Sequence, residues 1–271
     1  TATLIAGTGI GALGAADIDT NINNLQATNN VSGDIYIQEV NGLVIMGTGV
    51  RTLGGDGNIN IDVDAGALTV NSVVTADGDG NITLNADSGL ITINAVVSST
   101  SGDILITGDA IDQNSDITTG DVGANIGTIT LIADAGDITM ADLTTAQAGS
   151  GLITYTATGN VALSLLTTTG NVNVTADSDN VGGGAITDNT ALENPNIVAD
   201  TATLIAGTGI GALGAADINV DVNTMSATNN LVNDIYINEL NSAYFNSIIS
   251  NTGSINLLSH ASSLYKTITA A

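Results

Sequence analysis

Apolar and polar residues alternate in short stretches along most of this 271-residue chain, and a glycine precedes most of them. Six such stretches recur at similar intervals: GNINI (57–61), GNITL (80–84), GDILI (102–106), GTITL (127–131), GLITY (151–155) and GNVNV (170–174). Alternation with a period of two, rich in β-branched residues, predicts strands and not helices. The predicted inward residues are Ile59, Ile82, Ile104, Ile129, Ile153 and Val172, with Ile61, Leu84, Ile106, Leu131, Tyr155 and Val174 beside them.

A second series of stretches follows the first at a nearly constant offset, as in GALTV (66–70) and GLITI (89–93). A third apolar position comes shortly after these glycines, at Val73, Val96, Leu143 and Leu166. Three short strands per ~23 residues cannot each bury a face alone, but they can when coils stack on one another. We therefore expect an all-β fold, a right-handed parallel β-helix (β-solenoid) with about 23 residues and three short strands per coil. A β-sandwich is the alternative, although its strands need not repeat in register.

The chain also contains a repeat that is much longer than one coil. The first eighteen residues, TATLIAGTGIGALGAADI, recur unchanged at 201–218, and 29 of the 41 positions in 1–41 match those in 201–241. We expect one full module at 1–200 and the start of a second copy at 201–271, in one continuous β-helix. The stretch 177–196, which contains Pro195, is expected to be an enlarged corner loop at the seam. The chain is interpreted as an excerpt of a longer array.

Composition narrows the possible partners. The chain has 27 acidic residues against Arg51 and Lys266, and its net charge is −25. Nucleic acid and anionic membrane surfaces are repelled by this charge, and no basic run is present to contact phosphate. No stretch approaches the ~20 apolar residues of a membrane helix, so no membrane insertion is expected. The absence of cysteine excludes disulfides but leaves the compartment open.

The phrases ATLIAGTGIGALGAADI, ATNN and GDIYIQEVNGLVI within 2–46 resemble the repeats of very large bacterial surface and secreted proteins of the filamentous haemagglutinin-like class. The shorter Gly-x-Ile-Thr-Leu phrases fit as well, so the resemblance covers most of the chain. It implies the right-handed parallel β-helix of an adhesin shaft, located outside the cell or on the bacterial surface. It also implies further copies of the module in line, and a host or cell-surface glycan or protein as ligand.

The function predicted from these features is structural: a shaft segment of a long extracellular fibre, such as an adhesin or an appendage. One alternative is a polysaccharide-binding or polysaccharide-cleaving β-helix, and another is a subunit of an end-to-end filament. Enzymes that resemble this fold set basic residues beside carboxylates, and no Lys, Arg or His lies between positions 52 and 259. We therefore expect no catalytic residues, and we interpret His260 as a solvated side chain.

Acidic ladders are the candidate metal site. Asp56 and Asp79 occupy equivalent places in successive coil repeats, as do Asp64 and Asp87, so each pair should stack one coil apart. Two carboxylates ~4.8 Å apart repel by roughly 1 kcal/mol even in water. A bridging Ca²⁺ would reverse this repulsion, since it accepts carboxylate and carbonyl oxygens. The alternative is that each Asp caps turn backbone in water; no other cofactor is expected.

Overall fold

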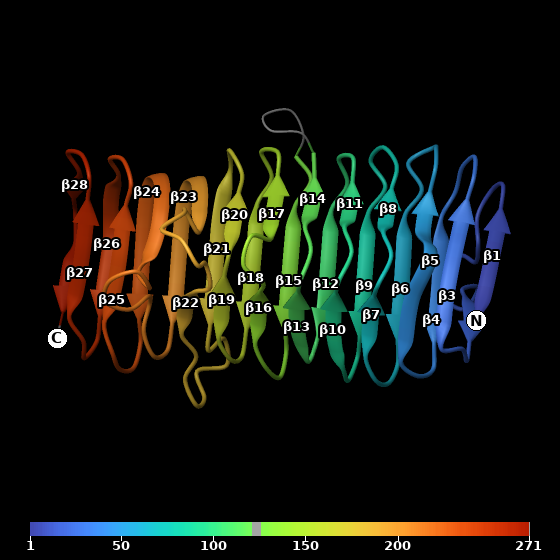
Figure 1. Ribbon diagram of the computed structural model, residues 1–271, viewed down its shortest axis with the longest axis horizontal. Coiled ribbons are helices and arrows are strands. Elements are labelled where there is room, and N and C mark those ends of the chain that lie inside the picture. The colour runs from blue at the N-terminus through green and yellow to red at the C-terminus, as the bar shows by residue number, and fades with distance from the viewer. Residues whose placement is uncertain (121–125, 271) are drawn as a thin grey trace.

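The computed structural model describes residues 1–120 and 126–270, and in this part of the chain it contains strands but no helix. The 29 strands of residues 1–120 and 126–270 belong to one sheet, and their pairs are all parallel. The sheet winds into a solenoid of about 11 turns, with stacked coils about 23 residues apart. The two termini lie at opposite ends of the rod (Figure 1). The expected all-β parallel solenoid is confirmed.

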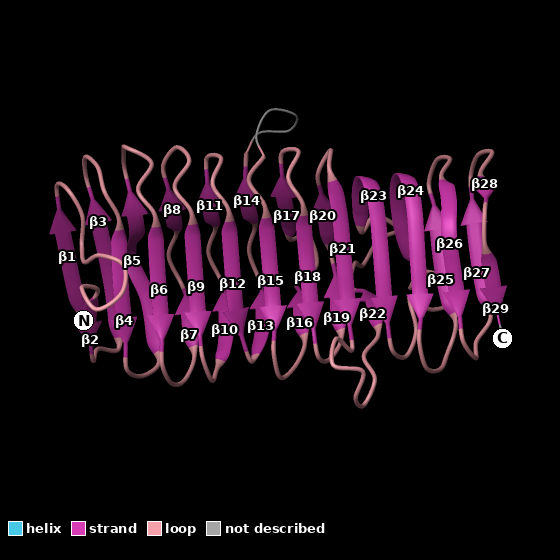
Figure 2. Cartoon of the chain, turned by 180° about the vertical axis from the view of Figure 1, so that it is seen from behind, coloured by secondary structure: helices cyan, strands magenta, loops and turns pink. Residues whose placement is uncertain are grey.

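Two opposite faces run along the rod, and we name them by the strands they contain. Face A, in front in Figure 2, contains β2 (Ile18–Thr20), β4 (Ile35–Glu39), β6 (Ile59–Val63), β9 (Ile82–Ala86), β12 (Ile104–Gly108), β15 (Ile129–Ala133), β18 (Ile153–Ala157), β21 (Asn171–Ala176), β26 (Tyr244–Ser250), β28 (Leu264–Tyr265) and β29 (Ile268–Ala270).

Face B, in front in Figure 1, contains β1 (Ala2–Ala6), β3 (Asn24–Asn29), β5 (Leu43–Thr52), β7 (Leu68–Val70), β8 (Val74–Ala76), β10 (Leu90–Ile93), β11 (Val97–Ser99), β13 (Ala110–Gln113), β14 (Ile117–Thr119), β16 (Ile138–Met140), β17 (Thr145–Ala148), β19 (Val161–Leu163), β20 (Leu165–Thr167), β22 (Ile186–Asp188), β25 (Ile235–Glu239) and β27 (Ile255–Ser259). Two long strands, β23 (Ile197–Ala206) and β24 (Ile218–Asn229), begin on face B and end on face A. The middle turns thus have the expected three strands, one on face A and two on face B.

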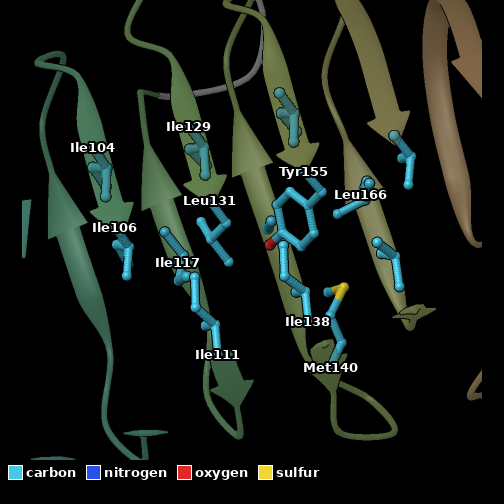
Figure 3. Packing of buried hydrophobic residues seen from close by; sticks show 14 of the residues in the cluster. Ile104, Ile106, Ile111, Ile117, Ile129, Leu131, Ile138, Met140, Tyr155 and Leu166 are labelled. Carbon is cyan, nitrogen blue, oxygen red and sulfur yellow. The ribbon is translucent and has the colours of Figure 1, made fainter. Parts of the chain in front are cut away.

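The core lies between the two faces and consists mostly of aliphatic side chains. All twelve residues predicted to point inward on face A are buried, with at most 1% of their surface exposed. The strand register stacks like on like, for example Ile82 on Ile104 and Ile104 on Ile129. Figure 3 shows Ile104, Ile129 and the Tyr155 ring pointing into the interior. Each large aliphatic residue buried in this way stabilises the fold by about 1.5–3 kcal/mol.

The third apolar series noted in the sequence lies mostly outside the core. Only Leu166 is buried; Val73 is 36% and Leu143 76% exposed, and Val96 is half-buried. The buried residue comes one position later in two of the coils, at Val74 and Val97. The reason is the corner before this strand, whose length varies, so that counting from a glycine does not give the phase. Leu143 itself has a φ of 67°, a corner conformation that directs its side chain outward.

The seam region 177–196 is not the single enlarged corner loop expected from the sequence, because a strand divides it into two loops. Its middle forms β22, which continues face B by pairing with β19. Beyond the seam, residues 201–205 pair with β21, and residues 201–206 pair with the last part of β24. The backbone ladder therefore passes from the first copy to the second without a gap.

Candidate functional site

The corner that leads into face A carries a row of polar side chains: Asp34, Asn58, Asn81, Asp103 and Thr128. The Asn81 amide donates to Asn58 Oδ1 at 2.9 Å, and the Asp103 amide donates to Asn81 Oδ1 at 2.7 Å. Asp34 and Asp103 accept the amides of the next turn in the same way, at 2.7 and 2.8 Å. Each of these acceptors thus satisfies a backbone donor of the following turn at a place where no strand begins yet.

Both predicted aspartate pairs stack one coil apart. Asp56 accepts a hydrogen bond from the backbone amide of Asp79 at 3.1 Å, and its own φ is 56°. Asp64 Oδ1 accepts from Gln38 at 2.8 Å, and the amide of Asp87 donates to the Val63 carbonyl at 3.0 Å. Of these contacts, that of Asp56 is the capping of turn backbone that was the alternative to a metal site.

The four aspartates do not form a single site. Asp56 and Asp79 precede strands β6 and β9, whereas Asp64 and Asp87 follow them, and a five-residue strand separates the pairs by ~17 Å. Within residues 1–120 and 126–270, no three His, Cys, Asp or Glu side chains are grouped so that they could hold a metal ion. Calcium binding by either pair stays a prediction.

The three basic side chains lie near the two ends of the rod. Arg51 is on β5, and its Nε is buried without a hydrogen-bond partner. His260 Nε2 lies 3.0 Å from Asn238 Oδ1, and Lys266 donates to Asn246 Oδ1 at 3.3 Å. The partners of His260 and Lys266 are thus asparagines and not the predicted aspartates.

Two buried glutamates, one in each copy, were missed by the sequence analysis. Glu39 ends β4 with none of its surface exposed, and its carboxylate is surrounded by donors. The Thr20 hydroxyl donates to Oε2 at 2.6 Å, and the Ile22 amide lies within 3.1 Å of both oxygens. The Asn41 amide donates to Oε1 at 3.2 Å. The charge is thus held by hydrogen bonds, which a buried carboxylate requires.

The equivalent Glu239 has fewer partners. The Asn241 amide donates to Oε1 at 3.0 Å, but Oε2 is buried without any donor, because the position of Thr20 is taken by Val220. Burial raises the pKa of Glu239 from 4.5 to about 7, and the nearby charge of Asp221 adds to this. The Asn241 and Val222 amides act on the pKa in the opposite direction. The second copy therefore contains an acid that titrates near neutral pH.

The loop 211–217 of the second copy contains another carboxylate with an unsatisfied oxygen. Asp217 Oδ1 is buried without a donor, and the pKa of Asp217 is raised by burial and by the charges of Glu193 and Asp188. Glu193 accepts from Asn219, and Asp188 accepts from Asn196 at 2.7 Å. Like charges therefore lie close together beside the enlarged corner, and their repulsion disfavours the ionised form of Asp217.

Asn29 and Asn229 hold the first turn of each copy together. Asn29 Oδ1 accepts the Gly9 amide at 3.1 Å, and its Nδ2 donates to the carbonyl oxygens of Ser32 and Gly33. Asn229 makes the equivalent three bonds with Gly209, Val232 and Asn233. A signal for these residues was present in the sequence. Asn29 and Glu39 are identical in both copies and stand at inward positions of the alternating pattern, where an aliphatic residue would otherwise be expected.

An exposed loop at 11–17, repeated at 211–217, covers the outside of a neighbouring strand in each copy. Leu13 and Leu213 at the loop tips are 77% and 81% exposed. The first loop borders a groove of about 240 Å³ that also contains Tyr36, Asn58 and Asn60 on face A. The second borders a groove of about 250 Å³ that contains Tyr236, Asn256 and Leu258 on face B. The same surface element thus occurs twice, each time with a leucine beside a tyrosine.

Comparisons with known proteins add no family assignment to the fold. No protein-family model matches the chain, and neither a curated protein nor a solved structure matches it. The likeness to filamentous haemagglutinin-like repeats consequently stays a resemblance, while the β-solenoid itself is shown by the structure. In the part of the chain that the structure describes, no helix could cross a membrane.

Proposed function

We propose that this chain is a shaft segment of a long extracellular or bacterial cell-surface fibre, of the adhesin or appendage kind. The observation that supports this best is the backbone pairing at the seam. Residues 201–206 add to the first copy through the same parallel ladder that joins turns within a copy. A module that stacks on its predecessor in this way can be repeated without linkers. At ~4.8 Å per turn of ~23 residues, each copy of residues 1–200 adds ~40 Å to the shaft.

Electron microscopy of chains with different copy numbers tests the proposal. Residues 1–200 would be present once, twice or four times before residues 201–271. We expect unbranched rods of constant width whose length rises by ~40 Å per added copy. Compact or beaded particles would contradict the shaft role. Antibodies against the chain should label intact cells of the source organism, and labelling that requires lysis would contradict the surface location.

A further copy of the module is the partner that this role requires. The net charge of −25 opposes lateral association of neighbouring rods, so contact at the ends of copies is favoured over bundling. The mass of the native polypeptide distinguishes two forms of the shaft. A mass many times 26.8 kDa indicates copies joined in one chain, whereas a mass close to 26.8 kDa indicates separate subunits that add end to end.

Polysaccharide binding is the second candidate function, and the groove beside Leu13 favours it. A tyrosine ring beside amide side chains suits a neutral sugar, which packs its C–H face on the ring and bonds its hydroxyls to the amides. A glycan array probed with the chain tests this, and the variant with Tyr36→Ala and Tyr236→Ala is the control. Micromolar binding that this variant loses supports the site, and the absence of binding rejects it.

A further inference from the structure

The repeated phrases of the two copies lie on opposite faces of the rod. Residues 2–6 form β1 on face B, whereas the identical residues 202–206 continue face A beyond β21. The reverse holds for the phrase DIYI, which leads into β4 on face A and into β25 on face B. Figure 2 shows the consequence: β1 points upward behind, and β23 and β24 point downward in front.

Within each copy, however, the local pairing is the same. Ala2 pairs with Leu25 and Ala202 with Met225, so the register offset between the first two turns is identical in both copies. The bridge from Ile10 to Ile35 is repeated from Ile210 to Ile235. The first turns of the two copies therefore fold alike, and those of the second copy are turned about the rod axis by half a turn.

The order of the strands along the chain gives the origin of this half-turn. Between β1 and the last part of β23 the chain changes face seventeen times, which is eight and a half turns per module. This count agrees with coils of about 23 residues. A module with a whole number of turns would return the repeated phrase to its own face. This module has an odd number of half-turns, so the phrase arrives on the other face.

The face on which a coil has two short strands in place of one also differs between the two copies. In the first copy, β5 on face B pairs with two short strands, β7 and β8, and face B stays two-stranded up to β20. In the second copy, β26 on face A pairs with two short strands, β28 and β29. Face B has meanwhile returned to single strands, β25 and β27. The side that splits into two strands therefore belongs to the module and turns with it.

We propose that successive modules of the array are each rotated by half a turn, so that the shaft presents the same surface alternately on its two sides. The rotation between the two copies is present in this chain, and its continuation along an array rests on the proposed shaft function. Two modules together make seventeen turns, so one structural period measures ~82 Å. The loop with Leu13 and its tyrosine groove recurs every ~41 Å, on alternating sides. A partner that binds this loop can thus be held on both sides of one fibre.

Paired labels on the 271-residue chain test the rotation directly. The chain contains no cysteine, so Leu13→Cys with Leu213→Cys gives two unique sites, and both side chains are exposed enough for the fold to tolerate the change. Each site would be coupled to biotin and streptavidin and imaged by negative-stain electron microscopy. The control pair is Leu13→Cys with Thr154→Cys, because Thr154 lies on β18 of face A between buried neighbours and so points outward.

We expect the two densities of the Leu13 and Leu213 pair on opposite sides of the rod, and those of the control pair on one side. Both pairs on one side would overturn the half-turn. The result on this chain does not depend on whether the native protein is a fibre.

A chain with four copies of residues 1–200, labelled at each copy of position 13, extends the test to the array. We expect labels that alternate between the two sides, with ~82 Å between neighbours on one side. Labels on a single side, repeated every ~41 Å, would overturn the proposal for the array.

Discussion

Replacing Val220 with Thr should stabilise the second copy at pH 8 and leave its stability nearly unchanged at pH 5. In the first copy the Thr20 hydroxyl donates to Glu39 Oε2, and Val220 stands at the equivalent place beside Glu239. Threonine and valine have nearly the same shape, so the substitution adds a donor with little change in packing. The donor would reach the one buried oxygen of Glu239 that lacks a partner.

The magnitude follows from the pKa of Glu239, which is raised from 4.5 to about 7. The unfolded chain ionises this group above pH 4.5, whereas the folded chain keeps the proton until about pH 7. The contribution of Glu239 to the free energy of unfolding therefore falls as the pH rises from 4.5 to about 7, and it is constant above this window. A shift of this size corresponds to about 3 kcal/mol. A hydrogen bond to a charged group recovers about 1.5–3 kcal/mol, so Val220→Thr should restore roughly 2 kcal/mol at pH 8.

Urea unfolding at pH 5 and pH 8, together with amide hydrogen exchange of residues 218–241, measures this effect. Exchange is needed because the terminal turns of a solenoid can open without the rest. Glu239→Gln, which removes the charge, should stabilise at pH 8 by a similar or larger amount. Thr20→Val is the reverse control and should destabilise the first copy at pH 8. If Val220→Thr and Glu239→Gln each have the same effect at both pH values, the buried charge is not the cause and the reasoning is refuted.

Three further predictions concern the corners and the core. Asn81→Ala should destabilise by about 1–3 kcal/mol in urea unfolding, because the Asp103 amide loses its acceptor, while Asn81→Asp keeps the acceptor and should cost less. Tyr155→Phe should cost about 1–2 kcal/mol, since the buried Gln113 Oε1 loses the tyrosine hydroxyl at 2.5 Å; no loss would show that water replaces it. Chelation of Ca²⁺ at low ionic strength should lower the melting temperature; full recovery with NaCl would show screening alone and reject sites at Asp56, Asp64, Asp79 and Asp87.

Much of the architecture was predictable because a solenoid repeats one simple pattern. Alternation and glycine spacing located the face A strands and their buried residues, Tyr155 included. The phase of the third strand was not predictable, because it depends on corner length, and corners such as that at Leu143 vary from coil to coil. Polar residues inside the core were missed for a different reason. Asn29 and Glu39 take aliphatic positions, and only the tertiary fold reveals the amides that they satisfy.

The rotation of the module was also beyond a sequence argument, because the number of half-turns depends on how the irregular coils are paired. The repeated loop explains why a module can adopt either orientation. Gly11 has a φ of 69°, and a Cβ there would lie 2.5 Å from the Tyr36 carbonyl oxygen; Gly211 has the same conformation and crosses Tyr236 equally closely. The loop is then closed by a bond from the Ala12 amide to the Ala16 carbonyl at 2.8 Å. All these contacts are made within one copy, so they hold the loop on its own strand whichever face that strand occupies. A sequence that specifies only its local pairing leaves orientation to the count of turns, and the odd count of half-turns between the two copies brings the repeated loop to the opposite face.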